Sequence, residues 1–495
     1  MKILKSKIFS MNIKVITYLS CTLFIFSMIP NWLLAFIARP SGDDYGYASA
    51  TRQIWLKTNS IVDVIKTGIQ TTKSMYEVWN GDWFSVFIFT LMPEVFVTKS
   101  FWIVPIFWSL ATIFTTYLFF DELLYHYLDF KKYQVLFITS IVLILCYQWI
   151  PSSAIGLYWY VGVIHYIMPH VLALLSISCV LKFLRTSLKI YIPIIILCMI
   201  AIGGSSYYSF FLAFLSYILI LFCFRNSLDK YKVYWFIPPI FMGLIALYYQ
   251  ISSPGNKARV GNTISLNGNK VLNTIWESYI ESIKRIYEYL NTKEIIFLLL
   301  FLIAIITFYF LIDNKTIYKF NNPLLFISYL YGIYAVMFTP EIYTKIEISG
   351  GPPTMVYISF ILITVISIIY LDGWIIRILK QSTHFKKIIF YKNYIPITGI
   401  FICLFLLFCF KSNIKETLFW ESVEYIVSGQ ASDYKKQMDS QLEILIDDSI
   451  KEVYLCPTNP IQGPLMHMPV IDDPKAFTNQ VIKDFYGKDF VIAYP

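Results

Sequence analysis

Hydrophobic residues in this chain occur in long unbroken stretches. Stretches such as 13–37 and 294–312 have the roughly 18 to 25 apolar residues that an α-helix needs to cross a hydrocarbon layer about 30 Å thick. The pattern predicts eleven membrane-spanning helices, at about 15–37, 100–122, 134–150, 158–181, 190–203, 207–224, 233–250, 295–312, 324–339, 354–371 and 395–410. The expected fold is therefore an all-α polytopic membrane protein.

Two segments between these spans have the apolar spacing of helices that lie flat in the membrane interface. Each repeats large apolar residues at three- and four-residue steps. In the outer loop 39–99 these residues are Ile61, Ile65, Ile69, Thr72, Tyr76, Trp79 and Trp83. In the outer loop 252–293 they are Leu272, Ile275, Trp276, Tyr279, Ile283, Ile286 and Leu290. A further short interfacial or re-entrant helix is predicted at 83–97, broken at Pro93.

The composition changes to that of a soluble protein after about residue 411. A polar helix is predicted at 416–446, a strand at 453–455, a helix at 475–486 and a last strand at 490–493. The chain thus divides into a transmembrane domain, 1–410, and a small C-terminal α/β domain, 411–495.

Composition and charge agree with this division. Hydrophobic residues make up 57% of the chain and charged residues 14%, against about 25% charged in soluble domains. Lys and Arg gather in alternate loops, and Lys345 is the only one in the short outer loops. By the positive-inside rule the N-terminus is cytoplasmic, and an odd number of spans puts the C-terminal domain outside the cell membrane. The lipid bilayer is the expected environment, and no nucleic-acid partner is expected.

The first chemical candidate is the acidic pair Asp43 and Asp44, within Pro40-Ser41-Gly42-Asp43-Asp44-Tyr45 directly after the first span. One carboxylate of such a pair can take a proton from a hydroxyl, while the other orients a substrate or raises its neighbour's basicity. The same residues could instead open the next helix as an N-cap. Spacing alone leaves both interpretations open.

Cationic and polar candidates lie at the outer ends of later spans. Ser253-Pro254-Gly255-Asn256-Lys257-Ala258-Arg259 predicts a tight turn that aims Lys257 and Arg259 toward the interface, where they could hold a phosphate or simply meet lipid headgroups. Glu341 and Lys345 are four residues apart and could either pair with each other or line the same cavity.

His165 lies inside the predicted fourth span, where an ionisable side chain is costly and normally faces a cavity or a partner. Only five His residues are present, and none has the spacing of metal ligands. No glycine-rich phosphate loop or nucleophile elbow occurs either. No cofactor or metal site is therefore expected, although use of a divalent metal stays open.

These motifs together resemble those of a bacterial multi-pass family in the GT-C superfamily of glycosyltransferases, related to the glucosyltransferases that decorate O-antigen and teichoic acids. The resemblance runs from Asp43-Asp44-Tyr45 through Trp79-Asn80-Gly81 to Ser253-Pro254-Gly255-Asn256 and Arg259, and it includes the C-terminal Asp473-Pro474. The residue after Trp-x-Gly is commonly Arg in that pattern. Here it is Asp82, which puts a phosphate-binding role for that corner in doubt.

The resemblance implies an inverting transferase that moves a sugar, expected to be a hexose, from a polyprenyl-phosphate donor to a cell-surface glycan or teichoic-acid-like acceptor. Asp43 or Asp44 would be the general base. The residues expected around the donor are Arg259, Lys257, His165, Lys345, Glu341, Tyr45, Trp79 and Asn256. The alternatives are a transporter or flippase of lipid-linked sugars, which predicts inverted repeats and broken helices at the midplane, and a polysaccharide polymerase or ligase.

Overall fold

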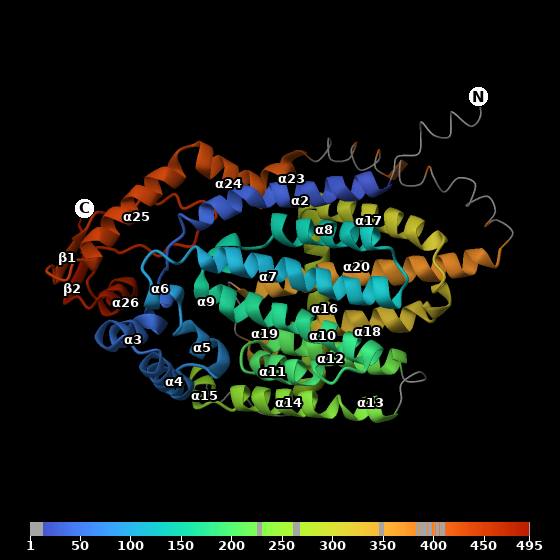
Figure 1. Ribbon diagram of the computed structural model, residues 1–495, viewed down its shortest axis with the longest axis horizontal. Coiled ribbons are helices and arrows are strands. Elements are labelled where there is room, and N and C mark those ends of the chain that lie inside the picture. The colour runs from blue at the N-terminus through green and yellow to red at the C-terminus, as the bar shows by residue number, and fades with distance from the viewer. Residues whose placement is uncertain are drawn as a thin grey trace.

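The computed structural model describes residues 13–224, 230–260, 268–345, 351–382 and 411–494, with the single positions 385, 394, 398, 399, 401 and 405. Most of its long helices run side by side along the longest axis of the molecule, and α16 crosses them (Figure 1). The elements up to the middle of the chain are α2 (Ile13–Ala35), α3 (Asp43–Thr58), α4 (Ile61–Val78), α5 (Trp83–Phe89), α6 (Pro93–Phe96), α7 (Ile103–Phe120), η1 (Asp121–Tyr127), α8 (Lys132–Gln148), η2 (Ala154–Tyr158), α9 (Tyr160–Gly162), η3 (Val163–Ile167), α10 (Met168–Thr186), α11 (Tyr191–Gly203), α12 (Tyr207–Phe224), α13 (Lys230–Tyr234), α14 (Ile237–Ile251) and α15 (Pro254–Val260). The remaining elements of the bundle are α16 (Gly268–Thr292), α17 (Glu294–Ile312), η5 (Ile317–Lys319), α18 (Pro323–Val336), α19 (Thr339–Thr344) and α20 (Gly351–Lys380).

Within the described part of the chain, seven helical stretches are long and apolar enough to cross a membrane: Lys14–Ala35, Ile103–Tyr127, Tyr160–Thr186, Tyr207–Phe224, Tyr231–Ile251, Glu294–Ile312 and Gly351–Lys380. They indicate a membrane protein. Three further predicted spans correspond to shorter apolar helices, α8, α11 and α18. The predicted eleventh span, 395–410, lies almost wholly outside the described residues, so eleven spans remain a prediction.

One end of the bundle carries α3, α4, α5, α6, α15 and the C-terminal elements within 430–493, on the left of Figure 1, and is called the capped end below. The predicted break at Pro93 is confirmed, because α5 stops at Phe89 and Pro93 is the first residue of α6. The apolar residues predicted to line one face of α4 include Ile61, Ile65 and Ile69, and all three side chains are exposed. A lipid interface would cover this face.

The C-terminal elements are α23 (Lys411–Lys415), α24 (Leu418–Val427), α25 (Gln430–Ile446), β1 (Glu452–Leu455), α26 (Phe477–Tyr486) and β2 (Phe490–Ala493). β1 and β2 form a parallel pair, with Val453 opposite Val491. Prediction of one helix over 416–446 was wrong, since Gly429, at a φ of 83°, separates α24 from α25.

The C-terminal elements are docked onto α3. Arg39 Nη2 forms an ion pair with Asp439 at 2.7 Å. The ring of Tyr45 packs edge-on against Phe485, with 5.0 Å between the ring centroids. Gln53 Nε2 donates to the carbonyl oxygen of Phe485 at 2.8 Å. The element that begins with the acidic pair is therefore held from both sides, by the bundle and by the C-terminal elements.

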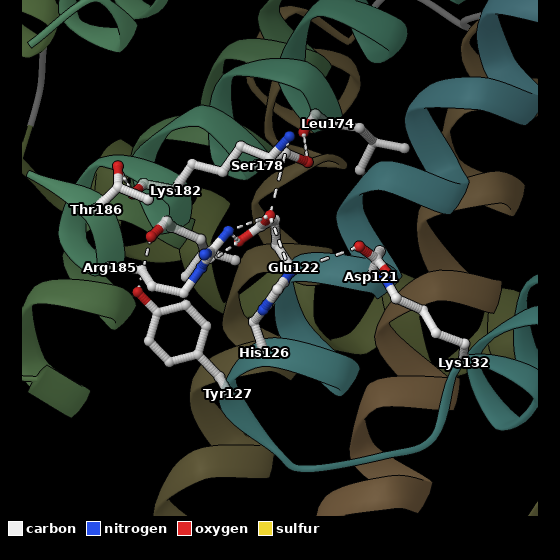
Figure 2. Close-up of polar contacts among 11 residues, drawn as sticks. Asp121, Glu122, His126, Tyr127, Lys132, Leu174, Ser178, Lys182, Arg185 and Thr186 are labelled. Carbon is white, nitrogen blue, oxygen red and sulfur yellow. Dashed lines mark hydrogen bonds and ion pairs between the residues drawn. The ribbon is translucent and has the colours of Figure 1, made fainter. Parts of the chain in front are cut away.

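At the opposite end of the bundle, a π-helical turn, η1, places Glu122 inside a ring of cations (Figure 2). Arg185 Nη2 lies 2.9 Å from Glu122 Oε1, and Lys182 Nζ lies 3.9 Å from the same oxygen. The Glu122 side chain is 2% exposed and that of Arg185 is 34% exposed. A buried carboxylate of this kind depends on its partners for stability.

We expect Arg185→Met to lower the free energy of unfolding by about 3 kcal/mol, because Glu122 would keep only the more distant Lys182 and His126, at 3.9 and 3.8 Å. The matched control is Arg285→Met, which removes a cation from the half-exposed pairs with Glu281 and Glu288 and should cost under about 1 kcal/mol. Thermal unfolding of both detergent-solubilised variants measures the difference. Equal shifts in melting temperature would contradict a stabilising role for the Glu122 pair.

Candidate functional site

Two distant corners of the chain interlock at the capped end. The corner after α4 contains Gly81, and the corner after α14 contains Gly255 and Asn256. A Cβ atom on Gly81 would lie 1.8 Å from the carbonyl oxygen of Gln250, and one on Gly255 would lie 2.6 Å from the backbone nitrogen of Trp79. Asn256 Oδ1 accepts from the Gly81 N–H at 3.2 Å, and Asn256 Nδ2 donates to the Gln250 carbonyl at 2.8 Å. Only glycine permits this backbone contact.

The interlock determines where Arg259 lies. The tight turn predicted at 253–256 is instead the start of α15, because Pro254 has the φ of a first helical turn and Ser253 Oγ accepts from the Asn256 N–H. One turn later, the Arg259 guanidinium lies over the Trp79 ring, 4.7 Å from its centroid. Arg259 is exposed and forms no ion pair with any residue that the structure describes.

Asp43 is the first residue of α3, and its carboxylate is half-buried. It forms no hydrogen bond or ion pair within the described part of the chain. Burial raises its pKa above the usual value of an aspartate. An unpartnered carboxylate with a raised pKa is suited to accept a proton from a hydroxyl.

Asp44 has a different environment from its neighbour. It is fully buried, and its two oxygens accept from the Ser41 N–H at 3.0 Å and the Val161 N–H at 2.9 Å. Burial raises the pKa of Asp44 to about 8, although backbone N–H groups of Val161, Ser41 and Tyr160 favour the charged form. Asp44 therefore joins the start of α3 to the start of α9. The Asp43 carboxylate, in contrast, has no partner among the described residues and can contact a substrate.

Tyr47, one turn after Asp43, links the acidic pair to the interlocked corners. Burial is the main cause that raises the pKa of its phenol, and Asp43, Asp82 and Arg259 also act on it electrostatically. Its ring packs on Phe89, with 4.9 Å between the centroids. Charged residues from α3, the corner after α4 and α15 thus act on one phenol.

Asp82 and His165 lie on the other side of Phe89. His165 Nε2 is 3.8 Å from Asp82 Oδ2, and the His165 ring centroid is 6.4 Å from that of Phe89. Gln250 Nε2 donates to Asp82 Oδ1. A carboxylate, an imidazole and an amide from three separate elements therefore meet.

Aromatic and acidic residues complete the rim of this site. Asp82 and Arg259 both interact electrostatically with the Tyr166 phenol, and Asp82 and Glu341 do so with Tyr208. A Cβ atom on Gly351 would overlap the Tyr166 ring. Tyr166 belongs to η3, Tyr208 to α12, and Gly351 begins α20.

Four of the predicted site residues are placed differently. Tyr45 packs against α26, and the Asn256 side chain is committed to backbone groups. Lys257 is exposed, with no ring contact among the described residues. Lys345 ends α19 in a left-handed conformation, with an exposed side chain that forms no ion pair with Glu341, although both residues are described.

The sequence did not single out Tyr47, Gln250 or Tyr166, and it gave no role to Asp82. Tyr47 was detectable in principle, because it lies four residues after Asp43 and so shares a helical face with it. Gln250 and Tyr166 come from helix ends whose approach depends on tertiary packing.

A second cluster has the composition of a metal site. Asp121, Glu122 and His126 offer ligand atoms that all lie within 4.8 Å of one another. The carboxylates are already neutralised, Glu122 by Arg185 and Lys182 and Asp121 by Lys132 (Figure 2). Another cation would have to displace these partners, so the cluster is best described as an ion-pair network.

No protein-family model matches the chain, and no curated protein matches it. The functional interpretation therefore depends on the geometry of the site.

We expect Asp44→Asn to flatten the pH dependence of stability. An exposed aspartate titrates near pH 4. Asp44 titrates at about 8 when folded, so the folded state holds its proton more tightly than the unfolded chain. The resulting stability is lost as pH rises toward and through that value. The wild-type melting temperature should fall between about pH 4 and pH 8 relative to the Asn variant. Parallel melting curves would contradict the assignment.

Proposed function

We propose that this protein is a membrane glycosyltransferase of the GT-C type, which transfers a sugar from a polyprenyl-phosphate donor to a hydroxyl of a cell-surface glycan or teichoic-acid-like polymer. The observation that carries the proposal is that an unpartnered carboxylate, Asp43, and a guanidinium with no ion pair among the described residues, Arg259, both act electrostatically on the Tyr47 phenol. Glycosyl transfer from a phosphate needs a base for the acceptor hydroxyl and a cation for the leaving group.

Asp43 is the residue of the acidic pair that suits the base. It is half-buried and has no partner among the described residues, whereas both oxygens of Asp44 are occupied by backbone N–H groups. In the proposed reaction the acceptor oxygen forms a bond to the sugar C1 as the C1–O bond to phosphate breaks. The acceptor proton passes to Asp43, and the configuration at C1 inverts.

Arg259 is the proposed ligand of the donor phosphate. Its guanidinium offers a planar fork of donors to anionic oxygens, and the Trp79 ring beneath it limits its motion. Glu341 and the exposed cations Lys257 and Lys345 stay further candidates for contact with the donor. No metal or cofactor is required by this scheme, because the charge of a phosphomonoester can be matched by cationic side chains.

A lipid-linked donor agrees with the position of the site. The distribution of Lys and Arg along the sequence supports an orientation in the plasma membrane with the capped end outside the cell and the N-terminus in the cytoplasm. Nucleotide sugars are made inside the cell and would not reach such a site. A polyprenyl chain would lie in the bilayer beside the exposed apolar face of α4 and deliver its phosphate at the interface.

The main rival is a transporter or flippase of lipid-linked sugars. That function predicts polar residues and broken helices at the midplane of the membrane. The ionisable residues assigned here are near helix ends on the capped side. The irregular helical segment formed by η2, α9 and η3 follows the end of α8, so it too is near a helix end. A transferase is therefore favoured. A polymerase or ligase would use the same donor chemistry on a different acceptor.

We expect Asp43→Asn to lower transfer by about 10²- to 10⁴-fold, the range for loss of a general base. The assay incubates the purified protein with radiolabelled polyprenyl-phosphate sugars and cell-wall extract. Asp63→Asn, which changes a half-exposed carboxylate on α4, is the matched control and should keep full activity. Undiminished transfer by the Asp43 variant, at equal protein level, would exclude Asp43 as the base.

We expect Arg259→Ala to raise the KM for the donor by roughly 10- to 100-fold, since a hydrogen bond to a charged group contributes about 1.5–3 kcal/mol. Arg259→Lys should recover only part of this loss, because Lys lacks the planar fork. Arg285→Ala on α16 controls for the loss of a surface cation. Unchanged donor KM in the Ala variant would remove Arg259 from the phosphate site.

A further inference from the structure

The C-terminal elements at the capped end have the opposite charge to the rest of the chain. Residues 430–493 contain ten Asp and Glu and six Lys, a formal charge of −4, whereas the whole chain has a formal charge of +9. Nine of the ten acidic residues are exposed, and the exception is Asp439. A surface with an excess of one charge attracts or repels every charged molecule that approaches it.

The cations nearest this surface are already committed to other groups. Arg39, Lys99 and Lys435 all face one carboxylate, Asp439, at 2.7, 3.9 and 2.6 Å. Lys488 is buried, and its Nζ donates to two backbone carbonyl oxygens. An anionic polymer at this boundary would have to compete with Asp439 for the same three cations.

The start of α26 and the residues before it lie beside the proposed base, Asp43. A Cβ atom on Gly42, the residue before Asp43, would lie 2.1 Å from the Met468 sulfur. A Cβ atom on Gly46, which is one helical turn after Asp43, would lie 3.9 Å from the Phe477 ring. The C-terminal elements therefore contact α3 on both sides of Asp43 along the chain.

Residues 468–477, called the approach segment below, combine carboxylates with an apolar ring. Asp472 and Asp473 are exposed, and neither forms an ion pair with a residue that the structure describes. The Phe477 side chain is 55% exposed. Carboxylates accept hydrogen bonds from hydroxyls, and an exposed aromatic ring can pack against the apolar face of a sugar ring. The phosphates of a polyanion would instead be repelled by these carboxylates.

We propose that the acceptor is an uncharged glycan and that it reaches Asp43 over the approach segment. This inference rests on the proposed function and selects between its two classes of acceptor, a glycan and a polyanionic, teichoic-acid-like polymer. The glycan hydroxyl loses its proton to Asp43 as its oxygen bonds to the sugar C1 and the C1–O bond to the donor phosphate breaks. An uncharged acceptor also leaves Arg259 to the donor phosphate, for which a polyanion would compete.

The test compares two kinds of acceptor, using the purified full-length protein and a radiolabelled polyprenyl-phosphate sugar. One kind is a set of uncharged polysaccharides, and the other is a polyol-phosphate polymer. Each is assayed at about 0.01 M salt and at about 0.15 M, where charges are screened beyond about 8 Å. At low salt kcat/KM should be at least about tenfold higher for the best uncharged acceptor, and added salt should narrow the difference.

Two pairs of substitutions test whether the charge effect arises at the approach segment. Asp472→Asn with Asp473→Asn should raise kcat/KM for the polyol-phosphate polymer by about three- to tenfold at low salt. The value for the uncharged acceptor should change little, because Asn keeps an oxygen that accepts hydrogen bonds. The matched control, Asp448→Asn with Asp489→Asn, removes two exposed carboxylates near the opposite end of α26 and should leave both values unchanged. An equal rise in the control pair, or no rise in either pair, would contradict the inference.

Phe477 tests the contact with the sugar ring. Phe477→Ala should raise the KM for the uncharged acceptor by about tenfold and leave the donor KM unchanged, whereas Phe477→Trp, which keeps an aromatic ring, should stay close to wild type. An acceptor KM that is equal in wild type and both variants would overturn the proposed route.

The outcomes separate this inference from the proposed function. Transfer by the wild type to the polyanion with equal or higher kcat/KM at low salt would overturn the inference and leave the transferase standing. Absence of transfer to every acceptor would instead reject the proposed function itself.

Discussion

The backbone contact between the corner after α4 and the start of α15 is the constraint on which the candidate site depends. Gly81 and Gly255 allow two chain segments far apart in sequence to approach more closely than any side chain would permit. The Asn256 amide then bridges the two corners with one donated and one accepted hydrogen bond. These contacts bring Asp82 and Trp79 from one corner next to Gln250 and Arg259 from the other.

The acidic pair illustrates how one local sequence can supply both structure and chemistry. Asp44 binds backbone N–H groups at the starts of α3 and α9, so it fixes the helix that carries Asp43. The C-terminal elements hold the other side of α3 through Tyr45 and Gln53. Asp43 is thereby presented without a partner of its own, at a cost in desolvation that raises its pKa. A rigid support of this kind suits a residue that must meet a reacting hydroxyl.

Periodicity and length allowed most of the fold to be predicted, because crossing lipid demands long apolar helices and interfacial helices need an apolar face. The break at Pro93, the strands at 452–455 and 490–493 and the exposed face of α4 follow from local sequence. The division of 416–446 at Gly429 and the helical start of α15 were mispredicted, since Gly and Pro each fit more than one backbone conformation. The approach of Asp82 to His165 and Gln250 was not predictable, because it arises from the packing of α5, η3 and α14, which no local pattern encodes.

The most direct measurement is an experimental structure of the purified protein with a short-chain polyprenyl phosphate bound. The account predicts the phosphate within hydrogen-bond distance of the Arg259 guanidinium, between Trp79 and His165, with Asp43 facing the same cavity. A lipid phosphate bound instead beside Lys182 and Arg185 at the opposite end of the bundle would contradict it.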